Sequence, residues 1–174
     1  NMSTGFFMGK PVAYSSISEN QDELDALQDV LSYNDEAAHN LRLAEEAAII
    51  GAAYELLYMD IDAKIRFQVV PSEEIILVCE ASLEENVICA IRHFRVYNLD
   101  GVTYQEYVDV YDKRDVTSYA YDSGTLRVIA DARPHYFDDV PIVEYENNKE
   151  RRGDFESVIT LVDAYNKAQS LTLD

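Results

Sequence analysis

Apolar residues recur at helical spacing in the first part of the chain. Residues 19–32 keep one apolar position every three or four residues, which predicts an amphipathic helix. Gln21 follows Ser18 by three positions, and this pairing matches a capping box at a helix start. The predicted apolar stripe comprises Leu24, Leu27, Val30 and Leu31.

A second helical pattern follows, in which most of the apolar residues are small. Asn34 can cap its first turn, and Gly51 marks its end because glycine readily takes the left-handed backbone of a helix C-terminus. Its apolar face comprises Ala37, Ala38, Leu41, Ala44 and Ala48, with Ile49 as a further candidate. A face this slim suits close packing onto the chain's own sheet, and contact with a neighbouring subunit is the alternative.

From Tyr54 onward the composition becomes typical of β-strands. Tyr, Val and Ile are enriched, and turn residues interrupt them at short intervals. The turn at residues 60–64 connects two strands, and further strands are predicted near 75–80, 87–96, 103–112, 116–121 and 125–130. Because the connections are short, we expect an antiparallel meander.

Near its C-terminus the chain combines a short strand with a third helix. Pro141 favours an extended residue before it, residues 142–145 favour a strand, and Asn147 with Asn148 ends that strand. Asp154 can then accept hydrogen bonds from the first turn of a helix over 155–169, whose apolar residues are Phe155, Val158, Ile159, Val162 and Tyr165. Together the patterns predict an α+β fold, mostly an antiparallel β-sheet meander with two N-terminal helices and one C-terminal helix.

The chain is strongly acidic, since 33 Asp and Glu against 14 Lys and Arg give a formal charge of −19. Affinity for nucleic acid comes largely from Lys and Arg, which here are few and dispersed except around Lys149, Arg151 and Arg152. We therefore expect no tight DNA binding by this chain. Simple solubility is a sufficient explanation of the acidic surface.

Length and hydropathy set further bounds. At 174 residues the chain suits one domain, and a chain of this size buries about 70% of its unfolded surface. No apolar run approaches the roughly 18 residues needed to cross a bilayer, and the N-terminus lacks the basic-then-apolar order of a signal peptide. We expect a soluble, unsecreted protein with no membrane partner. Asn1 before Met2 is consistent with a residue left by tag removal or with an excised internal fragment.

Phosphate-binding and catalytic motifs are incomplete. Residues 5–10, GFFMGK, place three residues between the glycines where a phosphate-binding loop needs four, and Pro11 stands where Ser or Thr would bind magnesium. No serine lies in a G-x-S-x-G elbow, and neither cysteine has a histidine close in sequence. The run Arg133-Pro134-His135 is typical of a loop, with an anion clamp as the alternative. We expect no catalytic residue, no enzyme activity and no cofactor.

Candidate metal ligands do not gather in the sequence. Asp60 with Asp62, and Asp138 with Asp139, could each offer two carboxylates to a cation, but acidic pairs are common in solvated turns. Three histidines lie far apart, without metal-ligand spacing, and each is expected at the surface or in loose packing: His39, His93 and His135. The sequence therefore predicts no metal site.

The two cysteines, Cys79 and Cys89, fall in apolar, strand-like stretches. A disulfide would require an oxidising compartment, and a zinc site would require about four ligands. We expect both cysteines to be small buried side chains.

Three blocks of sequence resemble one family. Residues 140–167, VPIVEYENNKERRGDFESVITLVDAYNK, are similar to a segment that portal proteins of tailed double-stranded DNA bacteriophages carry before their stem. Residues 9–15, GKPVAYS, resemble the family's G-K-P-V-x-Y run, and residues 51–60, GAAYELLYMD, with Asp62, resemble its G-x-A-Y-E-L-L-Y-x-D hairpin. The blocks stand in the family's order and span nearly the whole chain, which makes the resemblance far more specific than a single short motif.

This resemblance implies a structural component of the virion. Portal subunits form a ring, commonly of twelve copies, at one capsid vertex, where they nucleate head assembly, pass DNA during packaging and join the tail. The implied partners are other portal subunits, capsid and scaffold proteins, the terminase and tail-joining proteins. The implied locations are the virion and, during assembly, the host cytoplasm. In such a ring the −19 charge would provide walls past which DNA moves without sticking.

The resemblance also implies which part of a portal subunit this is. Residues 1–174 are similar to the outer, wing-like part as a single domain, and the helix expected at 155–169 would lead toward the stem. The stem, clip and crown of the family are absent from this sequence. We therefore expect the isolated chain to be a monomer or a weak oligomer.

Two other function classes fit parts of the sequence. An acidic DNA mimic, or another protein-interaction module, is supported by the charge alone. An enzyme that uses a carboxylate-bound metal is supported only by the acidic pairs. A DNA mimic would place its carboxylates along one exposed face and bind a basic partner in a salt-sensitive way.

Overall fold

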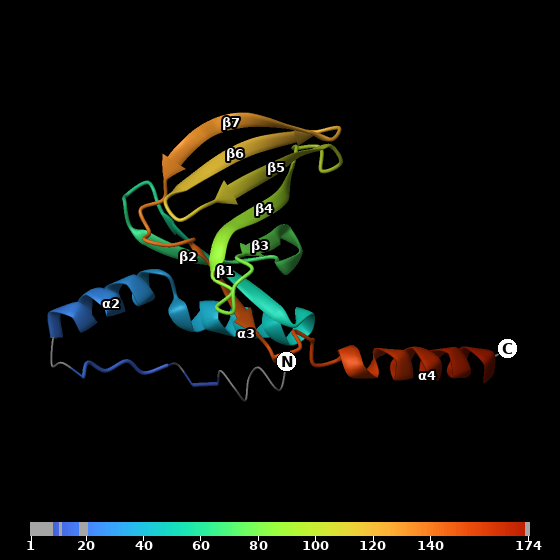
Figure 1. Ribbon diagram of the computed structural model, residues 1–174. Coiled ribbons are helices and arrows are strands. Elements are labelled where there is room, and N and C mark those ends of the chain that lie inside the picture. The colour runs from blue at the N-terminus through green and yellow to red at the C-terminus, as the bar shows by residue number, and fades with distance from the viewer. Residues whose placement is uncertain (1–8, 11, 18–20, 173–174) are drawn as a thin grey trace.

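The computed structural model describes residues 9–10, 12–17 and 21–172, which form three α-helices and eight β-strands (Figure 1). The helices are α2 (Gln21–Tyr33), α3 (Glu36–Ile50) and α4 (Ile159–Thr172), and short 3-10 turns cover Ser72–Glu74 and Glu156–Val158. The strands are β1 (Ala52–Met59), β2 (Ile65–Val70), β3 (Ile75–Cys79), β4 (Val87–Tyr97), β5 (Tyr104–Tyr111), β6 (Asp115–Asp122), β7 (Thr125–Pro134) and β8 (Ile142–Glu146). The predicted α+β class, with two N-terminal helices and one C-terminal helix, is confirmed.

The strands form two antiparallel sheets. β3 to β7 make a five-stranded meander in chain order, which we call the meander sheet and which the short connections predict. β1 is the central strand of a second sheet in the order β2-β1-β8, which we call the small sheet. Its register pairs Ala52 with Glu146 and Leu56 with Ile142, so residues from far along the sequence complete a sheet that begins near the first helices.

The main core lies between the two sheets. Side chains from the inner faces of both sheets meet there, together with Val140 from the segment before β8. The buried residues of this core are Leu56, Val70, Ile75, Ala90, Tyr111, Val116, Val140 and Ile142. α3 covers the other face of the small sheet through a smaller cluster of Leu43, Ala47 and Ala53. The described elements thus stack as α3, small sheet and meander sheet (Figure 1).

The buried face of α3 differs from the predicted one. Its buried residues are His39, Leu43, Ala47 and Ala48. Of the predicted face only Ala48 is buried, whereas Leu41 is 42% and Ile49 56% exposed. The polar His39 takes a core position because Glu55 of β1 lies opposite it, and helical periodicity cannot reveal such a partner.

His39 and Glu55 form a polar contact between α3 and β1. His39 Nε2 lies 2.5 Å from Glu55 Oε2, and the two side chains are only 7% and 13% exposed. The Phe67 ring contacts the imidazole edge-on, with 4.6 Å between ring centroids. The Tyr145 hydroxyl donates to the other oxygen of the Glu55 carboxylate at 3.4 Å. This pair therefore fixes where α3 sits on the small sheet.

The other two histidines occupy different environments. His135 is buried, its Nδ1 accepts from the Phe137 amide at 3.2 Å, and its Nε2 lies 2.9 Å from the Asp112 carbonyl oxygen. Since Nδ1 accepts a hydrogen bond, Nε2 carries the ring hydrogen and donates to the Asp112 carbonyl oxygen. The side chain of His93 is 45% exposed. The expectation of surface histidines is thus confirmed for His93 and wrong for His39 and His135, which have partners from distant segments.

The cysteines are both free thiols, but only one is partly covered. Cys89 is half-buried and Cys79 is exposed. The expected burial of Cys79 is wrong because it ends β3, an edge strand of the meander sheet, where the pairing with β4 is irregular.

Asn34 does not cap α3, contrary to the prediction. Asp35 is the N-cap residue, with a left-handed backbone (φ 50°, ψ 57°) and no side-chain cap hydrogen bond. The Asn34 amide instead donates to the Ile65 carbonyl at 3.0 Å, and its oxygen accepts from the Phe67 amide at 3.3 Å. The corner between α2 and α3 is thereby attached to β2. Ser18, the other predicted capping residue, lies outside the described residues.

The end of α2 is held by the turn that follows β1. The Tyr33 hydroxyl donates to Asp60 Oδ2 at 2.9 Å. Lys64 Nζ and the Arg66 guanidinium lie 4.5 Å and 4.8 Å from the centre of the Tyr33 ring. Cations over an aromatic face are attracted to it electrostatically, so α2, β1 and β2 are joined at this corner.

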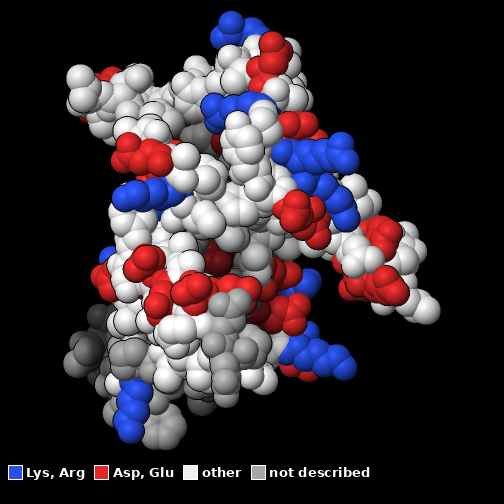
Figure 2. Space-filling model, turned by 90° about the vertical axis from the view of Figure 1, so that its left-hand side faces the viewer, with Lys and Arg blue, Asp and Glu red and all other residues white. Residues whose placement is uncertain are grey.

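The surface shows the acidity of the sequence. On the face drawn in Figure 2, carboxylate side chains form a band across the middle, with smaller groups of Lys and Arg around it. No helix within the described ranges is long and apolar enough to cross a membrane.

The His39–Glu55 pair gives a stability prediction. We expect His39→Ala to lower the free energy of unfolding by about 3 kcal/mol, because it leaves a nearly buried carboxylate without its main partner. Urea denaturation at neutral pH measures this loss. The matched control is His93→Ala, whose imidazole lies 3.9 Å from Glu106 and is 45% exposed, and we expect it to cost less than about 1 kcal/mol. Equal losses in the two variants would contradict the assigned role of His39.

Candidate functional site: the α4 junction

Residues 147–154, NNKERRGD, connect β8 to the 3-10 turn that precedes α4 and pack against the end of α3 and the start of β1. We call these residues, together with Gly51, the α4 junction. Figure 1 shows α4 leaving the body here and extending away from it. Every side chain from 154 to 170 is exposed, so contacts at the junction, and not along the helix, set the direction of α4.

Two asparagines hold the junction in shape. The Asn147 backbone amide donates to the Gly51 carbonyl at 2.9 Å, and its side-chain amide donates to the Arg152 carbonyl and to Asp154 Oδ1, both at 2.9 Å. The Asn148 side chain donates to the same Arg152 carbonyl at 2.6 Å and accepts from the Arg152 amide at 3.0 Å. Side chains of this type bond nearby backbone and so stabilise an irregular loop.

Two glycines allow the junction to contact α3 and β1 directly. Gly51 ends α3 in the left-handed region (φ 104°), and its amide donates to the Ala47 carbonyl at 2.8 Å. A Cβ at Gly51 would collide with the Arg151 carbonyl, and a Cβ at Gly153 would collide with the Ile49 carbonyl. Both obstacles are backbone atoms, so no side-chain rotation could make room for even a methyl group.

Asp154 has a different role from the predicted one. Its backbone amide donates to the Ala48 carbonyl at 2.8 Å, and its carboxylate accepts from the Asn147 side chain. The Glu156–Val158 turn intervenes, and α4 begins only at Ile159. Asp154 therefore does not cap the helix but attaches the chain to the end of α3.

Arg151 joins the junction to the edge of the small sheet. Its guanidinium donates to Glu144 Oε2 at 2.9 Å and to Glu146 Oε1 at 3.0 Å. The Tyr54 hydroxyl of β1 donates to the other oxygen of Glu144 at 3.0 Å. Burial, and then the hydrogen bond to Glu144, raise the pKa of Tyr54 to about 12. Neighbouring carboxylates, Glu144 first, raise the pKa of Arg151.

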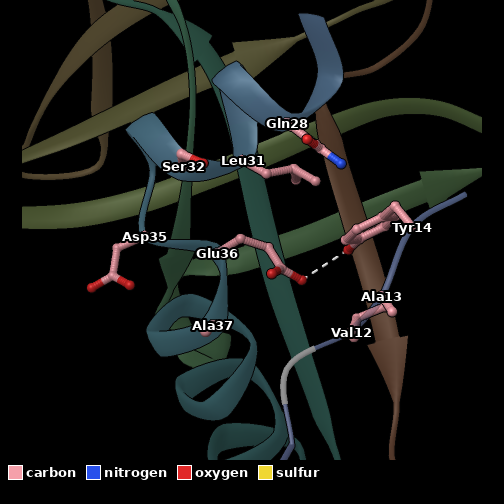
Figure 3. Close-up of a pocket in the computed structure, with 9 residues that line it drawn as sticks. All are labelled: Val12, Ala13, Tyr14, Gln28, Leu31, Ser32, Asp35, Glu36 and Ala37. Carbon is pink, nitrogen blue, oxygen red and sulfur yellow. Dashed lines mark hydrogen bonds between the residues drawn. The ribbon is translucent and has the colours of Figure 1, made fainter. Parts of the chain in front are cut away.

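The N-terminal segment contacts the first turn of α3. The Tyr14 hydroxyl donates to Glu36 Oε1 at 2.8 Å across a cavity of about 510 Å³ (Figure 3). Burial, followed by the hydrogen bond to Glu36, raises the pKa of Tyr14. The residues lining this cavity are Val12, Ala13, Tyr14, Gln28, Leu31, Ser32, Asp35, Glu36 and Ala37. The cavity thus lies between the N-terminal segment and the corner of α2 and α3.

The acidic pairs singled out in the sequence lie in turns. Asp60 Oδ1 accepts from the backbone amides of Asp62 and Lys64, each at 2.9 Å, and the Lys64 amide is the main cause of the lowered pKa of Asp60. Asp139 accepts from the following Val140 amide at 2.9 Å. Across the described ranges no three His, Cys, Asp or Glu side chains come together to hold a metal ion. The GFFM part of the phosphate-loop candidate lies outside those ranges.

The run at 133–135 is not the loop that its composition indicates. Arg133 and Pro134 belong to β7 and pair with Val116 and Asp115 of β6, and His135 follows directly. Proline is tolerated there because β7 is an edge strand of the meander sheet, whose outer side needs no amide donor.

Comparison with known proteins bears on the three blocks that the sequence analysis singled out. A sequence model of the family described as phage portal protein, SPP1 Gp6-like, matches residues 1–174. The chain belongs to this family. The portal protein of Bacillus phage SPP1 is 24% identical to it over 190 aligned positions, which cover 98% of this chain and 36% of that relative. The chain therefore spans little more than a third of the relative's length, and the family assignment made from the three blocks is confirmed.

The portal blocks have clear structural roles in the fold. The first supplies Tyr14, which bonds α3; the second contains Gly51 and β1; the third contains β8 and the junction loop. Residue patterns alone missed the contacts of Arg151 and Glu144, and only their presence in the third block signalled them. The second and third blocks thus contribute directly to the support of α4, and the first contacts the opposite end of α3.

The glycines give the most direct test of the junction. We expect Gly51→Ala and Gly153→Ala each to lower the free energy of unfolding by about 3 kcal/mol, because an added methyl group must displace backbone. Limited proteolysis should also cut the base of α4 faster in both variants, since the loop would no longer be held. The control is Gly101→Ala, where φ is 67° but nothing lies within 4 Å of the added Cβ, and the expected loss is about 1 kcal/mol. A Gly51→Ala variant as stable as Gly101→Ala would refute the close packing.

The Tyr54–Glu144 bond gives a prediction about alkaline pH. The pKa of Tyr54 is raised to about 12, above the value of about 10 for an unfolded phenol. The contribution of Tyr54 to stability is therefore complete below about pH 10 and is lost as the pH rises through about 12. We expect unfolding free energy to fall more steeply over this interval in the wild type than in Tyr54→Phe. In Glu144→Gln, phenolate absorbance should show Tyr54 ionising at lower pH, while Tyr111, whose pKa burial also raises to about 12, should not change.

Proposed function

We propose that this chain is a single domain forming the outer, wing-like part of a phage portal subunit, with a structural role and no catalysis. Its membership of the portal family supports the assignment. The observation that carries it is the backbone packing of Gly51 and Gly153, which attaches the base of α4 to α3. A subunit that is repeated around a ring must direct its following segment identically in every copy, and a rigid junction does this.

The partners follow from the proposed role. Other portal subunits form the ring, and capsid, scaffold, terminase and tail-joining proteins contact it during DNA packaging and head-tail joining. A closed ring of identical subunits uses head-to-tail contacts, so each subunit presents two different surfaces. The protein would act in the host cytoplasm during assembly and then remain in the virion.

The acidic surface is consistent with a subunit of a ring through which DNA passes. The formal charge of −19 and the carboxylate band in Figure 2 would repel a phosphate backbone, so DNA would move past such a wall without adhering. This repulsion comes from the protein's own carboxylates and requires no bound cofactor.

Electron microscopy of the natural gene product tests the proposal. We expect the wild-type product and its Gly101→Ala variant to form closed rings with a central channel. In the Gly51→Ala variant, altered α4 directions should reduce the fraction of closed rings several-fold, because small angular errors accumulate around a ring. A wild-type product that forms no ring, or phage particles that lack this protein at the DNA vertex, would overturn the assignment.

A further inference from the structure

An apolar groove opens on the side of the molecule away from the α4 junction. It has a volume of about 720 Å³ and lies between the end of β1, the turn after β1 and the end of β7. Its apolar lining includes Leu57, Met59, Ile61, Val116, Pro134 and Tyr136. We call it the β1–β7 groove. Its volume falls in the range of about 300–1,000 Å³ typical of binding pockets.

The walls of this groove are held in a fixed shape. Asp60 fixes the turn after β1 by accepting from the amides of Asp62 and Lys64. His135 fixes the opposite wall through bonds on both ring nitrogens. Ala63 and Tyr136 have left-handed backbones, with φ of 56° and 68°. Such conformations are costly for residues other than glycine and persist where the surroundings impose them, often at binding sites.

Both rims of the groove carry a large apolar side chain in solvent. Ile61 is fully exposed and Tyr136 is 77% exposed. Exposing apolar surface costs free energy, and apolar rims around a hollow are typical of a contact surface. The occupant of the groove should therefore itself be apolar.

The chain carries a matching apolar surface on and just before α4. The stripe consists of Phe155 (57% exposed), Val158 (40%), Ile159 (52%), Val162 (50%) and Tyr165 (62%). None of these side chains is buried against another part of the described chain. An amphipathic helix whose apolar side is uncovered requires a partner to bury it.

The α4 stripe of one chain cannot reach the groove of the same chain. The groove lies at Leu57–Met59, the far end of β1, whereas the junction holds the base of α4 at Gly51, before β1 begins. At about 3.3 Å per strand residue these sites are roughly 20 Å apart. Figure 1 shows that α4 points away from the end of the molecule where β1 and β7 finish. The two surfaces can therefore meet only between copies.

Charge at the two surfaces is complementary. Arg133 lines the groove and is exposed, and no ion pair joins it to another residue in the described part of the chain. Glu156 and Asp163 are seven positions apart, so they lie on the same side of the helical segment, beside the apolar stripe. The nearby Asp60 would not compete for Arg133, since its carboxylate already accepts from Tyr33, Asp62 and Lys64.

We propose that α4 of one copy docks its apolar stripe into the β1–β7 groove of a second copy, with the acidic edge of the stripe against Arg133. The contact is head-to-tail, so it leaves a free groove and a free α4 at the two ends of each pair and can continue to a closed ring. Its place in a virion rests on the proposed portal function. One helix in one groove buries little surface, so the isolated chain should associate weakly.

Sedimentation velocity on the 174-residue chain with three variants tests the contact. Val162→Asp places a charge in the stripe, and Ile61→Asp places one on the groove rim. Leu83→Asp is the matched control, because Leu83 is a fully exposed apolar residue in another loop. The three substituted side chains lie outside the core, and circular dichroism and thermal unfolding check that each variant folds.

The expected pattern is specific to a head-to-tail contact. Wild type and Leu83→Asp should self-associate at concentrations up to about 1 mM, and Val162→Asp and Ile61→Asp should each weaken association at least about tenfold. An equimolar mixture of Val162→Asp and Ile61→Asp should form heterodimers of nearly wild-type affinity and nothing larger, since only one intact stripe and one intact groove remain to pair.

Three results would overturn the proposal. The first is a wild-type chain that stays monomeric. The second is an Ile61→Asp variant that associates like wild type, which would mean that apolar stripes pair with each other. The third is a Leu83→Asp variant whose self-association is weakened as much as that of the other two variants. The natural gene product separates this proposal from the portal function. Rings that form equally well with Ile61→Asp would refute the docking and leave the portal function intact. Head-to-tail pairing of the 174-residue chain, combined with a natural gene product that forms no rings, would support the docking and refute the portal function.

Discussion

Direct contact between main-chain atoms at Gly51 and Gly153 is the constraint on which the arrangement of the C-terminal part depends. At both points a carbonyl group occupies the space where any other residue would carry its Cβ. Because neither obstacle is a side chain, the end of α3, the start of β1 and the junction loop hold their positions together. The His39–Glu55 pair extends this rigid unit, since it fixes α3 on β1. The direction of α4 is thus linked to the core through backbone and nearly buried polar groups.

The charges of the molecule are distributed in keeping with this organisation. Arginine side chains pair with carboxylates along the sheets, as Arg92 does with Glu74, Arg95 with Glu106 and Arg151 with Glu144. Much of the excess acid is exposed, where water solvates it and salt screens its repulsion. The strong net charge therefore disturbs the core little, while it disfavours close approach of other acidic surfaces. Any contact between copies must overcome this repulsion through apolar burial and local pairing of opposite charge.

Local patterns predicted the elements of this fold well and their partners poorly. The strands of the meander sheet follow each other through short turns, so alternation and turn residues were sufficient to predict them. β8 pairs with β1 across the whole meander, and nothing in its five residues indicates that pairing. The same limit explains the histidines, because the burial of His39 depends on Glu55 and that of His135 on Asp112. Resemblance to portal proteins singled out the segment that forms the junction, but only the folded structure shows that Asp154 bonds Asn147 and the end of α3 instead of capping a helix.

The pairing of β1 with β8 also determines the order in which the chain can fold. β1 precedes the meander sheet and β8 follows it, so the small sheet stays incomplete until all five strands of the meander sheet have left the ribosome. Contacts between such distant segments form slowly, because a long loop must close before they gain stability. The support of α4 therefore forms later than the local strand pairings of the meander sheet. Partly folded copies cannot present that helix at its final angle, which gives an assembling particle a simple means of excluding immature subunits.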